Sequence, residues 1–205
     1  MSHLRVDLRQ RAEELVALYP RPRSAMLPLL HLVQEQDGYV SAEGIAEVAA
    51  LTGTTTADVR GTASFYEMFH LEPVGKYVVS VCTNVACLLA GGLEMLEHVS
   101  ASLGCAVGAT SDDGLFTVEE AECLADCDVA PCVQVNHRYV RTTTPEAFDQ
   151  MVEELRTGRR DHEVPSHGTL VRVRRNGGLR VSNAEVVNER ASAKASRDER
   201  AKESA

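Results

Sequence analysis

Four of the six cysteines fall into two closely spaced couples. Four residues separate Cys82 from Cys87, three separate Cys123 from Cys127, and 35 residues lie between the couples. Each couple stands where a regular element is predicted to end, so that four sulfurs can converge while backbone N–H groups point at the same centre. Such thiolates bind structural zinc or an iron–sulfur cluster. Spacing alone leaves both alternatives open.

Other cysteine chemistry fits less well. The first twenty residues lack the apolar stretch of a secretory signal, which indicates a reducing compartment, where disulfides are rare. The chain has no Cys-x-x-Cys of the thioredoxin redox type and no glycine-rich phosphate loop, so neither a dithiol enzyme nor a nucleotide site is expected. The two remaining cysteines, Cys105 and Cys132, are predicted to pack as small apolar side chains.

Composition excludes further classes of protein. A chain of 205 residues with 44% hydrophobic and 25% charged residues is typical of globular proteins, and no apolar run approaches the ~20 residues of a membrane span. Residues 1–158 hold 10 lysines and arginines against 23 acids, net −13, whereas residues 159–205 are net +4. The acidic body argues against nucleic-acid binding. The basic tail is expected to be disordered alone, with a possible strand at 170–173 that would form on a partner.

Periodic apolar residues predict four short helices before the first cysteine couple. Proline and glycine end these segments, and Thr55 followed by Asp58 resembles a capping box before the fourth. The predicted helices cover residues 4–18, 24–38, 42–53 and 56–69. Together they predict a small four-helix bundle.

The pattern then changes to alternating strands and helices. A buried strand at 78–81 ends just before Cys82, and a helix is predicted from Leu88 to Leu103. Gly91 and Gly92, near its start, either permit a close backbone approach to a partner or to the cluster or simply make a weak helix start. The remaining predicted elements are a strand at 115–118, a hairpin of 132–135 with 139–141, and a helix from Thr144 to Arg156. This order predicts helices packed on a small mixed sheet.

Several stretches closely resemble one protein family. They are Tyr19–Glu35, Gly61–Phe69, Pro73–Tyr77, Cys82–Cys87 and Glu122–Pro131. They are similar, in the same order, to the thioredoxin-like 2Fe–2S subunit of respiratory complex I (NADH:quinone oxidoreductase), the bacterial E chain. The resemblance covers residues 5–157, and its two cysteine motifs, Cys-Thr-Asn-x-x-Cys and Glu-Cys-Leu-x-x-Cys, are highly specific.

The resemblance implies an α+β chain, with an N-terminal helical bundle over residues 1–73 and a thioredoxin-like 2Fe–2S domain over 74–158. The basic tail, 159–205, lies outside it. The family's ligands fall on Cys82, Cys87, Cys123 and Cys127, which would hold one 2Fe–2S cluster.

The resemblance also implies partners, since this chain would have no active site of its own. FMN and NADH would bind to a neighbouring subunit, whose flavin exchanges an electron with the cluster, and a large iron–sulfur subunit would be a second partner. The implied location is the peripheral arm of a membrane-bound complex, on the cytoplasmic face of a bacterial inner membrane. A diaphorase subunit of an NAD-linked hydrogenase or formate dehydrogenase, and a zinc scaffold, remain alternatives.

This sequence departs from the family pattern at two places. Ala125 and Asp126 stand where the family usually has Gly-Ala, and Cys132 stands where an apolar residue without a thiol is more usual. Neither change removes a ligand. Both bear on the reduction potential rather than on the presence of a cluster.

Overall fold

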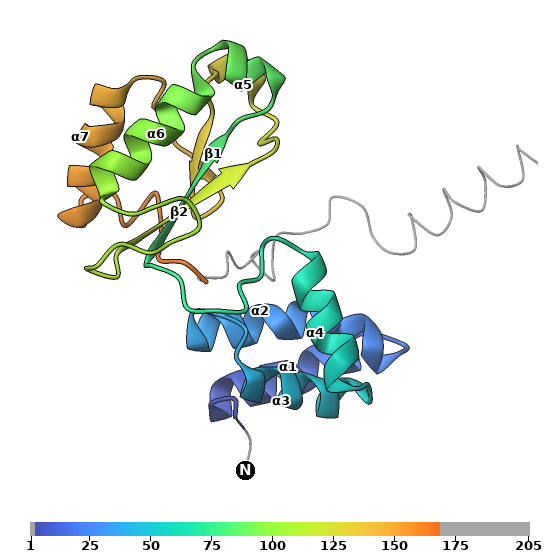
Figure 1. The fold of residues 1–205 in the computed structure, drawn as a ribbon. Coiled ribbons are helices and arrows are strands. Elements are labelled where there is room, and N and C mark those ends of the chain that lie inside the picture. Colours follow the sequence, from blue (N-terminus) through green and yellow to red (C-terminus); the bar gives the residue numbers. More distant parts are fainter. Residues whose placement is uncertain (1–2, 169–205) are drawn as a thin grey trace, which may run out of the picture. The chain divides into compact units, whose positions relative to one another are not determined.

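The computed structural model describes residues 3–168, which form seven α-helices and a four-stranded sheet (Figure 1). The strand predicted at 170–173 and most of the basic tail lie outside the described residues. None of the helices in the described part combines the length and apolar composition that crossing a membrane requires.

Four helices precede the sheet and share one hydrophobic core. They are α1 (Val6–Ala17), α2 (Met26–Asp37), α3 (Ala42–Thr52) and α4 (Thr56–Phe65), with a 3-10 turn η1 (Pro22–Ala25) before α2. The core that they share includes Leu8, Leu29, Leu30, Val33, Val48 and Val59, all almost fully buried. The capping box is confirmed: Asp58 N donates to Thr55 Oγ1 over 3.1 Å, and Thr55 N donates to Asp58 Oδ2 over 3.2 Å.

The prediction that the fourth helix reaches residue 69 is wrong, because α4 ends at Phe65. The side chain of Gln34 explains the early end. Its amide donates to the carbonyl oxygen of Met68 over 2.8 Å and accepts from the N–H of His70 over 3.0 Å. The backbone there is bonded to a buried glutamine instead of continuing the helix.

The sheet has the strand order β2-β1-β3-β4. Its strands are β1 (Tyr77–Cys82), β2 (Phe116–Ala121), β3 (Val133–Val135) and β4 (Arg138–Tyr139). β1 is parallel to β2 and antiparallel to β3, and β3 is antiparallel to β4. Because β1 and β2 are parallel neighbours, their carboxyl ends meet at one edge, with Cys82 opposite Ala121. The topology brings the two cysteine couples to that edge.

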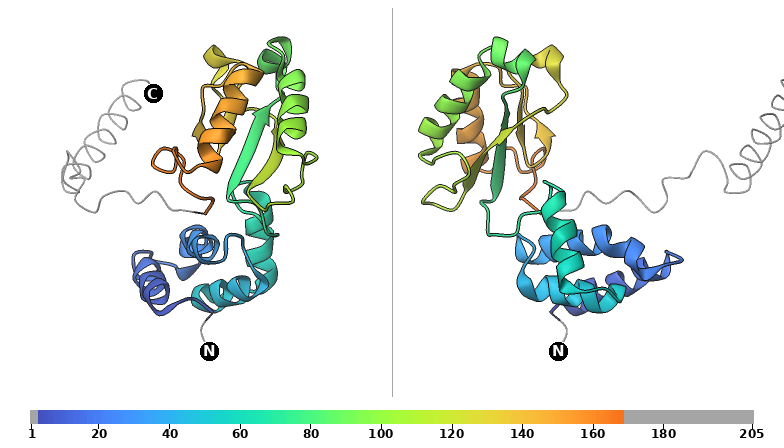
Figure 2. Two further views of the ribbon diagram at one scale, coloured as in Figure 1. Left: turned by 90° about the vertical axis from the view of Figure 1, so that its left-hand side faces the viewer. Right: turned by 45° about the vertical axis from the view of Figure 1, so that its right-hand side comes forward.

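Helices α6 (Gly92–Leu103) and α7 (Pro145–Arg156) lie next to each other on one face of the sheet (Figure 2). The core between them and the sheet includes alternate residues of the strands, among them Tyr77, Val79, Val81, Phe116, Val118, Val133 and Val135, together with Phe148 and Met151 of α7. It also includes Val164, six residues beyond Gly158, where the sequence predicts the core to end. Odd-numbered residues of β1 therefore face the helices, and Cys82 faces the other way.

The helix predicted from Leu88 to Leu103 is in fact two helices, α5 (Val85–Leu89) and α6. Gly91 separates them with φ +91°, a left-handed conformation that glycine adopts without steric cost. Gly92 then allows a close approach: a Cβ built there would lie 2.8 Å from the carbonyl oxygens of both Cys82 and Cys87. The close approach that the structure contains is to the backbones of Cys82 and Cys87, and it joins α6 to both residues of the first couple.

Candidate metal centre

The first cysteine couple is buried. Cys82 is the last residue of β1 and Cys87 lies inside α5, rather than before a helix as the sequence suggests. Their exposed fractions are 2% and 1%. The two side chains belong to one buried cluster, and Cys82 Sγ donates to the carbonyl oxygen of Glu122 over 3.8 Å. The first couple therefore touches the residue that precedes Cys123.

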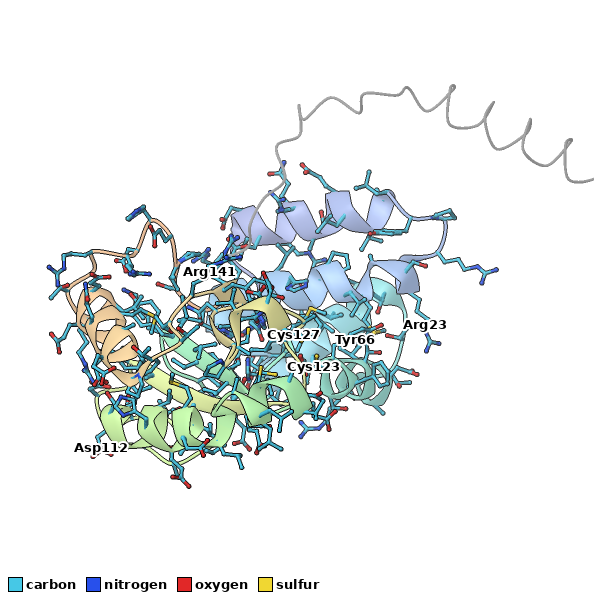
Figure 3. All side chains as sticks on the ribbon, turned by 90° about the horizontal axis from the view of Figure 1, so that it is seen from above. Arg23, Tyr66, Asp112, Cys123, Cys127 and Arg141 are labelled. Atoms are coloured by element: carbon cyan, nitrogen blue, oxygen red, sulfur yellow. The ribbon has the colours of Figure 1, made fainter. Side chains whose placement is uncertain are left out.

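The second couple is exposed, on the loop that follows β2 (Figure 3). Cys127 begins a 3-10 turn, η2 (Cys127–Val129), and Ala125 has the left-handed φ of +58°. Tyr139 on β4 anchors this loop, because its hydroxyl donates to the carbonyl oxygen of Leu124 over 2.5 Å. Sequence reasoning missed the role of Tyr139, since nothing in a lone tyrosine of a short hairpin indicates such a contact.

Cys132 lies with the first couple. It is 4% exposed and forms one buried cluster with Cys82 and Cys87, against which Leu124 and Ala130 pack. The prediction that Cys132 packs as a small apolar side chain fits its burial, but its neighbours are sulfurs. Cys105 is half-buried after α6 and packs against the core beneath α6 and α7.

Burial controls the protonation of these thiols. Burial is the main factor that raises the pKa of Cys87, and the backbone N–H of Cys132 acts in the opposite direction and lowers it. Burial also raises the pKa of Cys132 to about 12, and the charges of Asp126 and of the neighbouring thiols add to the effect. Cys87 and Cys132 therefore stay protonated at neutral pH until a cation replaces their protons.

The donor set fits a 2Fe–2S cluster, which takes four cysteine thiolates. The first couple supplies two adjoining sulfurs, and Cys127 is close enough to interact electrostatically with Cys87 and Cys132. Cys123 directly follows Glu122, which accepts the bond from Cys82. Within residues 3–168, no group of three or more His, Cys, Asp or Glu side chains already stands close enough together to hold a metal ion, and the four cysteines are included in this.

Comparison with known proteins gives consistent matches. Residues 12–156 match the family model described as thioredoxin-like [2Fe-2S] ferredoxin. A protein of Mycobacterium tuberculosis that is named as a subunit of NADH-quinone oxidoreductase is 41% identical over 157 residues, which is 77% of this chain and 61% of that protein. "NADH-quinone oxidoreductase subunit 2" of Thermus thermophilus is 40% identical over 159 residues, covering 76% of this chain and 88% of that protein.

The chain thus spans about three fifths of the length of its mycobacterial relatives. A solved structure, the NAD⁺-reducing [NiFe]-hydrogenase in the air-oxidized state, matches with a TM-score of 0.57 and 23% identity. That match covers 65% of this chain and 23% of the hydrogenase chain. At this identity the likeness concerns the fold alone.

Proposed function

Since the chain belongs to the thioredoxin-like [2Fe-2S] ferredoxin family, we propose that it is the electron-transfer subunit of an NADH:quinone oxidoreductase. It would hold one 2Fe–2S cluster through Cys82, Cys87, Cys123 and Cys127. The observation that carries the proposal is the position of the four cysteines at one edge of the sheet, inside the fold that matches the family. The relatives with 40–41% identity bear the name of that oxidoreductase.

When bound, the cluster would accept and release one electron at a time. The residues of this chain would hold it, stabilise its negative charge and limit its contact with water. Cys82 and Cys87 offer sulfurs on regular elements, and the N–H of Cys132 already points at the sulfur of Cys87. Such N–H donors stabilise thiolate charge and tune the potential. Leu124 and Ala130 cover the buried side, while the second couple stays accessible.

An electron partner is expected to dock close to the exposed couple. The short helix α5, which carries Cys87, and the start of α6 present apolar side chains to solvent. These are Val85, Leu88, Leu89 and Leu93, with exposed fractions between 44% and 85%. Apolar side chains gathered beside a redox site favour protein docking there. We assign the surface to the subunit that binds flavin and NADH, because this sequence has no phosphate-binding loop of its own.

The proposed assembly also gives roles to the parts of the chain. Residues 1–73 would form a four-helix bundle that docks on neighbouring subunits, including the large iron–sulfur subunit. Residues 74–158 would be the cluster domain, to whose core Val164 also belongs, and the remaining basic residues would bind to a partner. The complex would place the chain in the peripheral arm, on the cytoplasmic face of a bacterial inner membrane.

Metal and sulfide analysis tests this function. The protein is purified without air, or reconstituted with ferrous iron and sulfide, and is expected to hold about two irons and two sulfides and to give a paramagnetic signal on one-electron reduction. Cys123→Ala should abolish that signal, and Cys105→Ser is the matched control, which should keep it. Tightly bound zinc without sulfide would establish the scaffold alternative instead, and a cluster that survives in Cys123→Ala would overturn the ligand assignment.

A diaphorase role in an NAD-linked hydrogenase or formate dehydrogenase is distinguished by the partners. Gentle extraction from the source cells, capture of the tagged full chain and mass spectrometry would identify them. Co-purification with a flavoprotein and membrane subunits of a quinone-reducing complex supports the proposal. Recovery of hydrogenase or formate dehydrogenase subunits would contradict it.

A further inference from the structure

We propose that Cys132 is a reserve ligand of the cluster, whose thiol takes the place of Cys87 when that ligand is lost. The inference rests on the proposed function and extends it to a fifth cysteine. It is carried by the position of Cys132 among the sulfurs of the first couple.

The register of the sheet places Cys132 beside Cys82. Val81 pairs with Val133 across β1 and β3, so the next pair along the ladder is Cys82 with Cys132. Cys82 N donates to the carbonyl oxygen of Cys132 over 3.0 Å, so the two residues face each other across the end of the ladder. Opposite residues of a ladder share one face of the sheet, so both side chains project to the same side.

Cys132 also packs in the buried cluster that contains Cys87. Each of the three cysteines is at least 96% buried, and they form one cluster. A cluster that lost Cys87 would find Cys132 next to the vacated position, on the same side of the sheet as Cys82.

The exchange needs no oxidant. In the wild-type chain, the iron–sulfur bond to Cys87 breaks and the Cys87 thiolate takes up a proton, while Cys132 gives its thiol proton to water and its sulfur bonds to iron. The cluster again has four thiolates and an unchanged electron count. Cys105 cannot serve in this way, because it packs with the separate core beneath α6 and α7.

Alanine variants of the full chain test the reserve ligand, because alanine cannot coordinate iron. After reconstitution with ferrous iron and sulfide under a thiol reductant, Cys87→Ala is expected to keep at least about half of the wild-type iron and sulfide. Its paramagnetic signal and midpoint potential should differ from those of the wild type. Cys87→Ala/Cys132→Ala should bind at least about five times less iron than Cys87→Ala.

Matched variants complete the comparison. Cys87→Ala/Cys105→Ala should resemble Cys87→Ala, and the iron content of Cys132→Ala alone gives the baseline for the double variant. Equal loss of iron in Cys87→Ala and in Cys87→Ala/Cys132→Ala would overturn the proposal, as would equal retention. If circular dichroism shows that the alanine variants do not fold, Cys87→Val with and without Cys132→Val makes the same comparison, because valine cannot coordinate iron either.

The two proposals fail in different ways. A wild-type chain that takes up no iron and sulfide refutes the proposed function. A wild-type chain with a full cluster, together with a Cys87→Ala variant that has none, refutes only the reserve ligand.

Discussion

The close approach of Gly92 to the first cysteine couple makes Gly92→Ala a sharp test of how the fold positions the sulfurs. The added Cβ would lie 2.8 Å from two carbonyl oxygens and 2.9 Å from the carbonyl carbon of Cys87. Ordinary contacts begin near 3.4 Å, so the backbones must separate by roughly half an ångström in a closely packed region.

The cost follows from that displacement. Overpacking of a core typically costs about 1–3 kcal/mol, and the gain in helix propensity from glycine to alanine offsets at most ~1 kcal/mol of it. We expect a net loss of about 1–2 kcal/mol, which for a folded part of this size lowers Tm by roughly 3–8 °C. The displaced carbonyls belong to Cys82 and Cys87, so cluster occupancy should fall as well.

Thermal unfolding followed by circular dichroism, with iron and sulfide analysis of the same samples, measures both effects. Gly61→Ala is the matched control. It lies inside α4, where nothing stands within 4 Å of an added Cβ, and should raise stability by up to ~1 kcal/mol without changing iron content. If Gly92→Ala is as stable as Gly61→Ala and binds as much iron, the close approach does not position the sulfurs.

Two further predictions concern the loop that carries the second cysteine couple and the loss of stability at acid pH. Ala125→Gly should raise the free energy of unfolding by about 1 kcal/mol, because φ +58° strains an alanine but not a glycine. An unchanged midpoint of urea unfolding would contradict this. Burial, with the nearby His70 and His137, lowers the pKa of His167 from 6.5 to about 4. In this pH range the unfolded chain binds a proton that the folded chain does not. Wild-type stability should therefore fall as pH drops from about 6.5 to about 4. In urea titrations, His167→Gln should lose less stability between pH 7 and pH 5 than the wild type. Replacement of the exposed His162 in His162→Gln is the control and should leave the loss as in the wild type. Identical losses in all three proteins would refute the assignment.

Local signals were sufficient to predict most elements. The capping box at Thr55, the strand that ends at Cys82 and the helix that begins after Thr144 depend on neighbouring residues, and the structure contains all three. The same reasoning placed the couples at the ends of β1 and β2, because alternating apolar residues mark buried strands.

The parts that sequence reasoning missed depend on contacts distant in the chain. The end of α4 is set by Gln34, which is more than thirty positions away from the backbone that it binds. The proximity of Cys132 to Cys87 requires the register between β1 and β3, which no local pattern reveals. The glycine pair left a close approach and a weak helix start equally open, and the contact of Gly92 with Cys82 and Cys87 becomes visible only once α6 is packed on the sheet.

Because β1 pairs directly with β2, the positions of the four sulfurs depend on this pairing and not on the length of the chain between the two couples. Both couples are anchored by one ladder of backbone bonds, from Tyr77 opposite Phe116 to Cys82 opposite Ala121. The connection from Gly104 to Leu115 returns the chain to the start of that ladder and pairs with β2 through the bridge between Thr110 and Thr117. Closing a longer connection costs little entropy, about 0.6 kcal/mol for each doubling. Insertions at the exposed turn around Asp112, outside that bridge, are therefore tolerable in evolution and in engineering, whereas a one-residue slip of the ladder would turn Cys82 to the opposite face.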